Sequence, residues 1–373
     1  MTSTAIRITE EALADARARI GNETPVRHWY NQEATRDAIR HFAYGIGDLN
    51  PLWSDPDYAR GTRFGDVIAP PCFLHSCGQF NYVGLPGIHS MFSGTDWEFV
   101  RPLVAGDSVR ATTKLVDMIE RPSRFAGRSV EQLHETIYRN ERSEVVARAI
   151  YRQFRTERDT AKGKAKYSTL ERATYTPEQI AQIDSEVERE EVRGATPRYW
   201  EDVAEGDELG PVVKGPLTVT DMIGWLMGWG GVFVRPHRIG AEYRRRHPAA
   251  YLADEYGVPD VPERVHWDND FARRVGVPAA YDYGPQRIAW LGQVMTNWVG
   301  DAGWVAKLSV RLRRHNLVGD TTWCRGKVAR RYVEDGRHLV DVELAAVDQR
   351  GETTATGTAT AELPSHEKLS SRP

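Results

Sequence analysis

The sequence is poor in cysteine and has no long hydrophobic run. Its 373 residues include only three cysteines, Cys72, Cys77 and Cys324, which are too few for a disulfide framework. No stretch approaches the ~20 consecutive apolar residues that a membrane-spanning helix needs. The N-terminus has the pattern of a capped, charged helix and lacks the apolar core of a secretion signal. We therefore expect a cytoplasmic protein without a membrane segment.

A strong excess of charge of either sign is also absent, as are several common motifs. The formal net charge is −3, so no basic field attracts nucleic acid or an anionic membrane. The sequence contains no glycine-rich phosphate loop, no paired Cys-x-x-Cys and no Gly-x-Ser-x-Gly elbow. These absences argue against nucleic-acid binding, nucleotide-dependent redox chemistry and serine hydrolysis.

The most informative stretch covers residues 42–74, where two apolar helical patterns flank a polar turn. Gly47 can adopt a left-handed conformation, and Pro51 keeps Asn50 out of the helical region, so the first helix must end here. Asp48 and Asn50 are therefore predicted at a sharp exit of the chain. Two roles are open for them, because Asp and Asn can belong to a catalytic site but also commonly cap turns by bonding neighbouring amides.

The elements around this turn predict one compact lobe. An amphipathic helix is expected over residues 34–46, and a second, strongly apolar helix is expected after Pro71. From residue 92 to residue 154 the hydrophobic period changes towards two, as in strands with one buried face. The predicted lobe is therefore a helix, a long buried central helix and a curved antiparallel sheet.

The same plan recurs later in the chain. Trp200 starts a strand pattern, and Thr218 starts a helical pattern as Thr35 does in the first half. Leu317-Val318-Gly319-Asp320 parallels Val104-Ala105-Gly106-Asp107, and strand patterns follow both. We therefore predict an internal duplication. The predicted parts are an N-terminal lobe over residues 1–158, a charged linker helix over 159–197 and a C-terminal lobe over 198–373.

The second half contains groups that the first half lacks. His266 lies near a carboxylate, either Asp260 or its rival Glu263, and Gly284 starts another apolar helical pattern. The amide of a helix-starting glycine can point at an oxygen, and the helix dipole reinforces it. The matching position in the first half is Pro71, which has no N–H.

These two stretches resemble, in complementary ways, the signature Asp-x-Asn-Pro-x-His of the MaoC-like enoyl thioester hydratases and dehydratases. The run Asp48-Leu49-Asn50-Pro51 matches its first part, but Trp53 stands in place of the histidine. His266, Asp268 and Ala272 match the His-x-Asp-then-Ala spacing of the same family, and Gly284 falls where the family keeps its helix-starting glycine. The resemblance implies an α+β double hot-dog fold, with two lobes that each wrap a curved antiparallel sheet around a long central helix. It also implies that the N-terminal half is of the FAS1-like dehydratase kind.

The resemblance further implies a hydro-lyase that interconverts an enoyl-CoA and a 3-hydroxyacyl-CoA, with no metal or redox cofactor. Adding water to such a thioester needs a base, an acid and a donor for the enolate oxygen. We expect His266 to donate the proton, the Gly284 N–H to polarise the thioester and Asp260 to hold the water. The first lobe, with Asp48 and Asn50, is expected to accommodate the acyl chain.

Further residues are candidates for contact with the substrate. The aromatic and acidic side chains just before Gly284 are candidates for the pocket lining, although packing alone would also explain them. Arginines bind phosphate bidentately, so a basic group on a later strand is a candidate for the coenzyme A phosphates, with a solvated strand face as the alternative. These candidates are Tyr281, Asp282, Tyr283, Arg311, Arg313 and Arg314.

The sequence leaves a metal site and two other functions as alternatives to this hypothesis. Cys72, His75 and Cys77 are close in sequence, but three ligands on one buried helix have poor geometry, so no metal site is predicted. The same fold could serve as an acyl-CoA thioesterase, in which a carboxylate activates water against the carbonyl. It could also be a catalytically silent acyl-thioester-binding subunit. A homodimer is expected, or an assembly with another hot-dog subunit, with no nucleic-acid or membrane partner.

Overall fold

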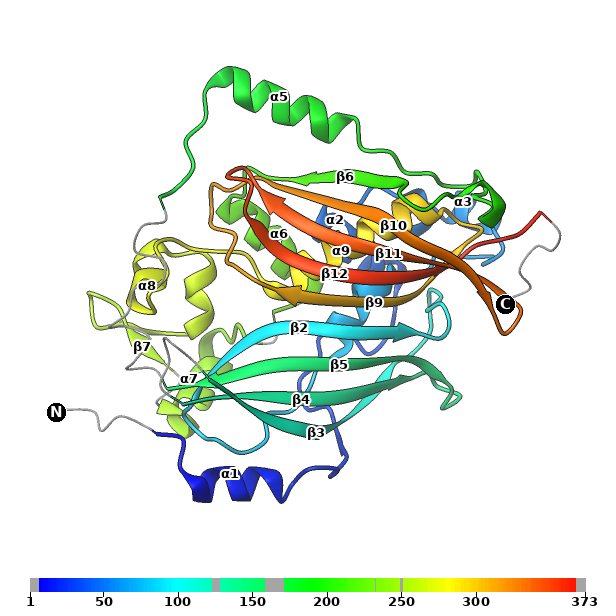
Figure 1. The fold of residues 1–373 in the computed structure, drawn as a ribbon. Coiled ribbons are helices and arrows are strands. Elements are labelled where there is room, and N and C mark those ends of the chain that lie inside the picture. Colours follow the sequence, from blue (N-terminus) through cyan, green and yellow to red (C-terminus); the bar gives the residue numbers. More distant parts are fainter. Residues whose placement is uncertain (1–6, 123–127, 158–170, 232, 249–250, 367–373) are drawn as a thin grey trace.

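The structure is a computed structural model, and it describes residues 7–122, 128–157, 171–231, 233–248 and 251–366. Ten strands of these residues form a single antiparallel sheet, and Figure 1 shows the strands of the first half below those of the second. The strands of the first half are β1 (Thr24–Pro25), β2 (His89–Phe99), β3 (Arg110–Pro122), β4 (Arg128–Arg139) and β5 (Val145–Thr156). Those of the second half are β6 (Glu208–Lys214), β9 (Trp304–Leu312), β10 (Thr322–Glu334), β11 (Arg337–Asp348) and β12 (Thr353–Glu362).

The strand order is mirrored about the centre of the sheet. From the central pair outwards it is β2-β5-β4-β3-β1 on one side and β9-β12-β11-β10-β6 on the other. This is the arrangement that the predicted duplication requires. The two halves are joined edge to edge, because β2 pairs directly with β9. The division into parts at residues 158 and 197 stays a prediction.

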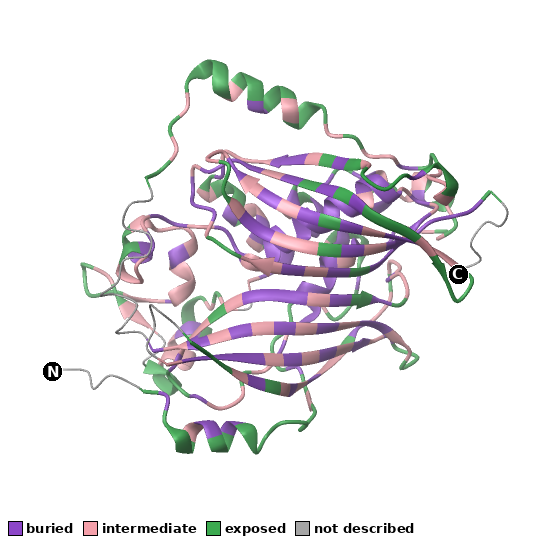
Figure 2. Cartoon of the chain, viewed as in Figure 1, coloured by how far each residue is buried: buried purple, intermediate pink, exposed green. Residues whose placement is uncertain are grey.

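Three helices lie inside the curve of the sheet. The central one is α9 (Gly284–Val299), which is buried along nearly its whole length (Figure 2). Beside it, α2 (Arg36–Ile46) and α6 (Val219–Trp229) pack against each other, one from each half. Their backbones approach closely, because a Cβ on Gly45 would lie 2.9 Å from the Gly224 carbonyl oxygen. Threonine caps begin both helices, as the sequence predicts.

The remaining elements are short and lie mostly at the periphery. The helices are α1 (Glu10–Arg17), α3 (Pro56–Arg60), α5 (Pro177–Glu188), α7 (His237–Arg246) and α8 (Asn269–Arg274). The 3₁₀ helices are η1 (Pro51–Trp53), η2 (Pro71–Cys77), η3 (Trp200–Asp202) and η5 (Pro262–His266), and a small second sheet pairs β7 (Leu252–Ala253) with β8 (Pro259–Asp260). In the described part of the chain, no helix has both the length and the apolar character to cross a membrane.

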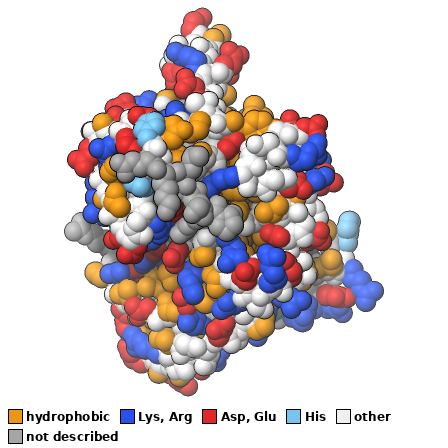
Figure 3. Space-filling view, turned by 90° about the vertical axis from the view of Figure 1, so that its right-hand side faces the viewer, with side chains coloured by type: hydrophobic (Ala, Val, Ile, Leu, Met, Phe, Trp, Pro, Cys, Tyr) orange, Lys and Arg blue, Asp and Glu red, His pale blue; other side chains and the backbone are white. Residues whose placement is uncertain are grey.

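The predicted linker region contains α5, which stands away from the body of the protein (Figure 1). Seen from the side in Figure 3, it forms a projection covered with charged side chains of both signs. Thr176 caps it through a reciprocal pair of hydrogen bonds with Gln179, and Ile183 is its buried residue. The first residues of the predicted linker, 159–170, lie outside the described part.

Two sequence predictions about secondary structure are wrong. The first half has no long central helix after Pro71: only η2 forms there, and the chain then continues as a loop to Ile88. Gly78 ends η2 at a φ of +108°, which a helix cannot accommodate, and its carbonyl accepts a hydrogen bond from the Tyr138 hydroxyl on β4 (2.6 Å). The predicted strand at Trp200 is instead the 3₁₀ helix η3.

The seam between the halves depends on a glycine. Gly94 on β2 has a φ of +154° and pairs with Arg311 on β9, beside an irregularity in the strand. A Cβ at this position would overlap the carbonyl oxygen of Val310. On the outer face of the seam, Asp96 accepts hydrogen bonds from Arg152 (2.9 Å) and Ser309 and forms an ion pair with Arg311 (2.7 Å).

A buried ion pair fixes the start of α9. Asp282 and Arg287 are almost completely inaccessible to solvent, and both carboxylate oxygens accept hydrogen bonds from the guanidinium group. Arg287 also donates to the carbonyls of Arg314 (2.7 Å) and Thr354 (2.9 Å). The backbone N–H of Asp282 donates to the carbonyl of Asn316 (2.9 Å). The turn before α9 is therefore tied to the sheet.

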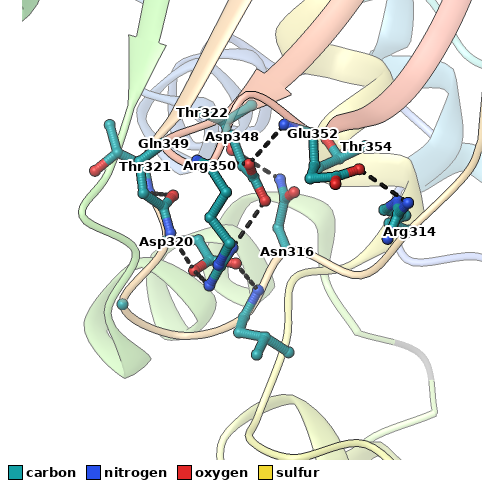
Figure 4. A network of polar contacts seen from close by, with 12 residues as sticks. Arg314, Asn316, Asp320, Thr321, Thr322, Asp348, Gln349, Arg350, Glu352 and Thr354 are labelled. Atoms are coloured by element: carbon teal, nitrogen blue, oxygen red, sulfur yellow. Dashed lines mark hydrogen bonds and ion pairs between the residues drawn. The ribbon is translucent and has the colours of Figure 1, made fainter. Parts of the chain in front are cut away.

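A polar network, drawn in Figure 4, adjoins this ion pair through Asn316. Asp320 accepts hydrogen bonds from the Leu317 N–H (2.9 Å) and from Gln349 (2.7 Å), and it pairs with Arg350. Asn316 donates to Thr322 (2.9 Å) and to Asp282 (3.3 Å). The network thus holds the loop that receives the backbone of residues 280–282, and with it the position of Gly284.

We predict that Gly94→Ala weakens the seam. The substitution adds both an unfavourable φ and a clash with the β9 backbone, so the free energy of unfolding should fall by about 3 kcal/mol or more. Gly106→Ala is the matched control, because Gly106 also has a positive φ (+98°) but nothing lies within 4 Å of its added Cβ. It should cost only about 1–2 kcal/mol. Urea unfolding followed by tryptophan fluorescence measures both, and equal losses would contradict this account of the seam.

The ion pair yields a second prediction. Arg287→Met leaves the Asp282 carboxylate buried without a counter-charge, which should cost about 3–5 kcal/mol of unfolding free energy. Adding Asp282→Leu removes that charge and should recover at least half of the loss. Arg330→Met is the exposed control, since Arg330 pairs with Asp341 at the surface, and it should cost less than about 1 kcal/mol. A double variant as unstable as Arg287→Met alone would contradict the explanation.

Candidate functional site

In the first half, hydrogen bonds within the turn that contains Asp48 and Asn50 stabilise it. Gly47 ends α2 in the left-handed conformation (φ +66°), and the chain turns into η1 as the sequence predicts. The Asp48 carboxylate accepts hydrogen bonds from the Asn50 N–H (3.0 Å) and from the indole N–H of Trp53 (2.9 Å). The Asn50 side chain in turn accepts from the Leu52 N–H (3.0 Å). Both Asp48 and Asn50 are buried, and their side chains stabilise the turn through these hydrogen bonds.

Asp48 is part of a buried polar cluster between the halves. Burial raises the pKa of Asp48 to about 6, against the effect of its hydrogen bonds and of the nearby Lys214. Burial lowers the pKa of Lys214, whose ammonium group donates to the Gly47 carbonyl (3.2 Å). Gln293 on α9 donates to the same carbonyl (3.3 Å) and to Glu190 (2.6 Å). These contacts tie the turn to α9 and β6.

In the second half, η5 brings His266 to the start of α9. The Nδ1 atom of His266 lies 2.8 Å from the Tyr281 carbonyl oxygen. A carbonyl can only accept, so Nδ1 carries the proton and Nε2 is left with its lone pair. The imidazole also stacks on the Tyr283 ring, with 3.7 Å between centroids. Burial lowers the pKa of His266 to about 4, so the ring is neutral at pH 7.

The tautomer changes one prediction. A neutral imidazole with a free Nε2 is a proton acceptor, so the resting state does not fit the proton donor that the sequence predicts at His266. The group that fits a donor is Glu263. Burial raises the pKa of Glu263 to about 7, so much of it is protonated at neutral pH.

Glu263 and His266 lie on one side of η5. Residues three apart eclipse each other in a 3₁₀ helix, and these two are three apart. The negative charge of Glu263 also acts on the pKa of Tyr283, on which His266 stacks. The carboxyl group and the imidazole therefore both lie near Tyr283.

Asp260, the predicted water-binding carboxylate, is placed differently. One oxygen accepts from the Val261 N–H (2.7 Å), and the other lies 3.3 Å from the Arg264 guanidinium. Its side chain is 39 % exposed. Arg264 also pairs with Asp254 and Asp268, so Asp260 belongs to a partly exposed ion-pair cluster. The structure therefore places Asp260 with Arg264.

Gly284 is the first residue of α9, as predicted, and Tyr283 is its N-cap. The first amides of a helix have no acceptor within the helix. No acceptor for the Gly284 N–H is found among the described residues. A Cβ on Gly284 would lie 2.5 Å from Phe92 of the first half and 2.6 Å from Leu312, so only glycine fits between this amide and the sheet.

The other predicted substrate contacts divide into two groups. Tyr281 and Tyr283 hold His266 from two sides, through the Tyr281 carbonyl and the Tyr283 ring. Asp282 is fully buried and bonded to Arg287, which does not fit the predicted place in a pocket lining. It positions the two tyrosines on either side of it.

The predicted phosphate-binding arginines lie on the sheet with other partners. Arg311 pairs with Asp96 at the seam, and Arg314 pairs with Glu352 (2.9 Å). Arg313 donates to the Thr356 hydroxyl (3.1 Å). These contacts fit the alternative of a strand face better than a grip on coenzyme A.

The cysteines are buried and separate. Cys72 lies against the Ile288 carbonyl of α9 (4.0 Å), and Cys77 lies beside Ser76 (3.9 Å). In the described residues, no group of three or more His, Cys, Asp or Glu side chains is arranged to hold a metal ion.

The sequence gives only a weak signal that Glu263 belongs to the site. It stands where the family signature has asparagine, so pattern matching left it as a rival to Asp260. The available signal was the proline at the start of a short helix, Pro262, together with the three-residue spacing to His266.

Comparisons with known proteins agree with this architecture. Residues 18–149 match the family model described as "FAS1-like, dehydratase domain region". A UPF0336 protein from Streptomyces avermitilis is 32 % identical over 126 residues, which is 32 % of this chain and 81 % of that protein. A probable enoyl-CoA hydratase alpha subunit from Thermomonospora curvata is 27 % identical over 154 residues, covering 34 % of this chain and 48 % of that one.

Solved structures extend the likeness over both halves. A MaoC-like dehydratase covers 93 % of this chain and 99 % of its own, with a TM-score of 0.64 and 18 % identity. A conserved protein from Mycobacterium tuberculosis described as a double hot-dog fold covers 91 % and 95 %, with a TM-score of 0.55 and 10 % identity. The predicted double hot-dog fold is therefore confirmed, and it is shared with a MaoC-like dehydratase. The chain belongs with the UPF0336 proteins, and its residues 18–149 are similar to the FAS1-like dehydratase region.

Proposed function

We propose that the protein hydrates an enoyl-CoA thioester, or dehydrates the corresponding 3-hydroxyacyl-CoA, at the start of α9. The observation that carries the proposal is that Tyr281 holds His266 through Nδ1, while the amide of Gly284 lies only three residues after Tyr281. A neutral imidazole and a helix-starting amide therefore belong to the same turn. The family supports a hydratase or dehydratase reaction, and coenzyme A as the thiol is part of the proposal.

The reaction needs three groups, and the site offers each. His266 Nε2 accepts a proton from water while the water oxygen attacks C3 of the enoyl group. The Gly284 N–H, at the positive end of α9, stabilises the charge that develops on the thioester oxygen. The Glu263 carboxyl group then gives its proton to C2. A proton returns from His266 to Glu263 afterwards, so the enzyme ends as it began.

The first half does not offer a second site of this kind. The indole of Trp53 fills the place of the histidine, and its N–H binds the Asp48 carboxylate, so no imidazole is present to take a proton. Pro71 stands where the second half has Gly284, and it has no N–H for a thioester oxygen. Asp48 and Asn50 therefore have structural roles in this proposal.

We predict that hydration of crotonyl-CoA, followed by loss of the enoyl-thioester absorbance, falls at least ~100-fold in kcat in His266→Ala and in Glu263→Gln. The Asp48→Asn variant, in the first half, should keep kcat within about threefold of the wild type. Loss of activity in Asp48→Asn with normal activity in His266→Ala would move the chemistry to the first half.

The pKa values also set the expected pH profile of hydration. The base acts when unprotonated, above its pKa of about 4, and the acid acts when protonated, below its pKa of about 7. The value of kcat/KM should therefore be flat between about pH 5 and 6, be halved near pH 7 and fall roughly tenfold per unit well above it.

A thioesterase remains the second candidate on this fold, because a carboxylate could also activate a water molecule that attacks the thioester carbonyl. Release of free coenzyme A from an acyl thioester would identify it, since hydration leaves the thioester intact. Association with a second copy or another hot-dog chain stays a prediction, as does a silent binding role.

A further inference from the structure

The inner face of β4 is polar, which is unusual for the interior of a sheet that wraps a core. Alternate residues of a strand share one face, and four consecutive inward residues of β4 carry hydrogen-bonding groups. The four are Gln132, His134, Thr136 and Tyr138. The corresponding strand of the second half, β11, has apolar side chains at four consecutive inward positions and packs against α9. These side chains are Val340, Val342, Leu344 and Ala346.

Three of the four polar side chains on β4 have a structural explanation. The loop that replaces the central helix cannot satisfy its own carbonyls. Gln132 donates to the Val83 carbonyl (2.8 Å), Tyr138 donates to Gly78 (2.6 Å), and Thr136 donates to the Gln79 carbonyl. Support of this loop therefore accounts for them.

His134 has no such explanation. Its side chain is fully buried, yet neither ring nitrogen has a hydrogen-bond partner among the residues that the structure describes. Burial lowers the pKa of His134 to about 3, so the ring is neutral and offers one donor and one acceptor. A buried polar group without a partner destabilises a protein by about 1–3 kcal/mol, so such groups are uncommon in cores.

Two more such groups lie close to it. His134 is the cross-strand neighbour of Tyr151, and Tyr151 is the cross-strand neighbour of Thr95, so the three form one row across the sheet. The Thr95 hydroxyl has no partner in the described part of the chain. His75 lies over this row with Nδ1 3.4 Å from the Tyr151 hydroxyl, and its Nε2 is likewise unpartnered among described residues.

This row adjoins the site proposed for hydration. The space beside Gly284 is filled by the Phe92 ring, and that ring lies 6.3 Å from the Tyr151 ring. The Phe80 ring stands between Tyr151 (5.6 Å) and His134 (4.8 Å). A thioester held at the Gly284 amide therefore has its acyl end close to the interior of the first half.

We propose that the polar groups of Thr95, His75 and His134 recognise oxygen atoms on the acyl group, so that the preferred substrate carries hydroxyl or keto groups beyond C4. This inference rests on the proposed function. It makes the sequence-based expectation, a first half that accommodates the acyl chain, more specific, because a purely alkyl chain would leave these groups unpaired.

The experiment compares two substrates of equal length, 2-octenoyl-CoA and 7-hydroxy-2-octenoyl-CoA. The wild type should show at least ~10-fold higher kcat/KM for the hydroxylated substrate, because a site built to bind a hydroxyl rejects the analogue that lacks it. The ratio should fall to about one in His134→Leu. It should stay unchanged in the matched control His41→Leu, since His41 is exposed on α2.

Thermal unfolding supplies the second readout. A ligand-binding imidazole without internal partners should be replaceable by leucine with no loss of melting temperature, whereas a structural histidine should not. Equal kcat/KM for the two octenoyl substrates, or a preference that survives His134→Leu, would overturn the inference. If the wild type fails to hydrate crotonyl-CoA, the proposed function fails instead. Calorimetric binding of 7-hydroxyoctanoyl-CoA against octanoyl-CoA then tests the row alone, and equal affinities overturn it.

Discussion

The buried ion pair between Asp282 and Arg287 is the interaction on which the site depends. It fixes the two residues that flank Asp282 along the chain, and each of them touches His266. The same pair sets where α9 begins, and so where the Gly284 amide points. A buried ion pair is weak evidence for stability, but here it determines geometry, because Arg287 also grips two carbonyls of the sheet.

The halves of the molecule have diverged around this constraint. The second half keeps a long central helix packed against apolar strands, and its rigid N-terminus presents an amide. The first half has lost that helix at Gly78 and fills the space with a loop held by polar strand residues. Because β2 and β9 form one continuous sheet, the interior of the first half faces the site of the second. In our proposal, the second half therefore carries out the chemistry and the first half recognises the acyl group.

Much of the fold was predictable because its signals are local. The threonine caps, the left-handed Gly47 and the exit at Pro51 each depend on a few neighbouring residues, and all appear where expected. The duplication was predictable because it repeats such signals. The loss of the first central helix was not, since the apolar run after Pro71 favours a helix and only Gly78 and the distant Tyr138 oppose it.

The site was less predictable, because its decisive contacts join residues far apart in the sequence. The sequence places Asp260 near His266, but it does not reveal that Arg264 binds Asp260. Arg311 looks like a phosphate ligand until its partner Asp96, from the other half, is seen. The tautomer of His266 follows from a carbonyl fifteen residues away, and that contact exists only in the folded chain.

The central claim is that the turn before α9 holds His266 as a neutral base with a free Nε2. Nitrogen-15 NMR of the histidine-labelled protein, with His266→Ala for assignment, tests this most directly. The account predicts a proton on Nδ1, an unprotonated Nε2 at pH 7 and titration near the pKa of about 4. A proton on Nε2 at neutral pH, or titration near the ordinary value of 6.5, would contradict it.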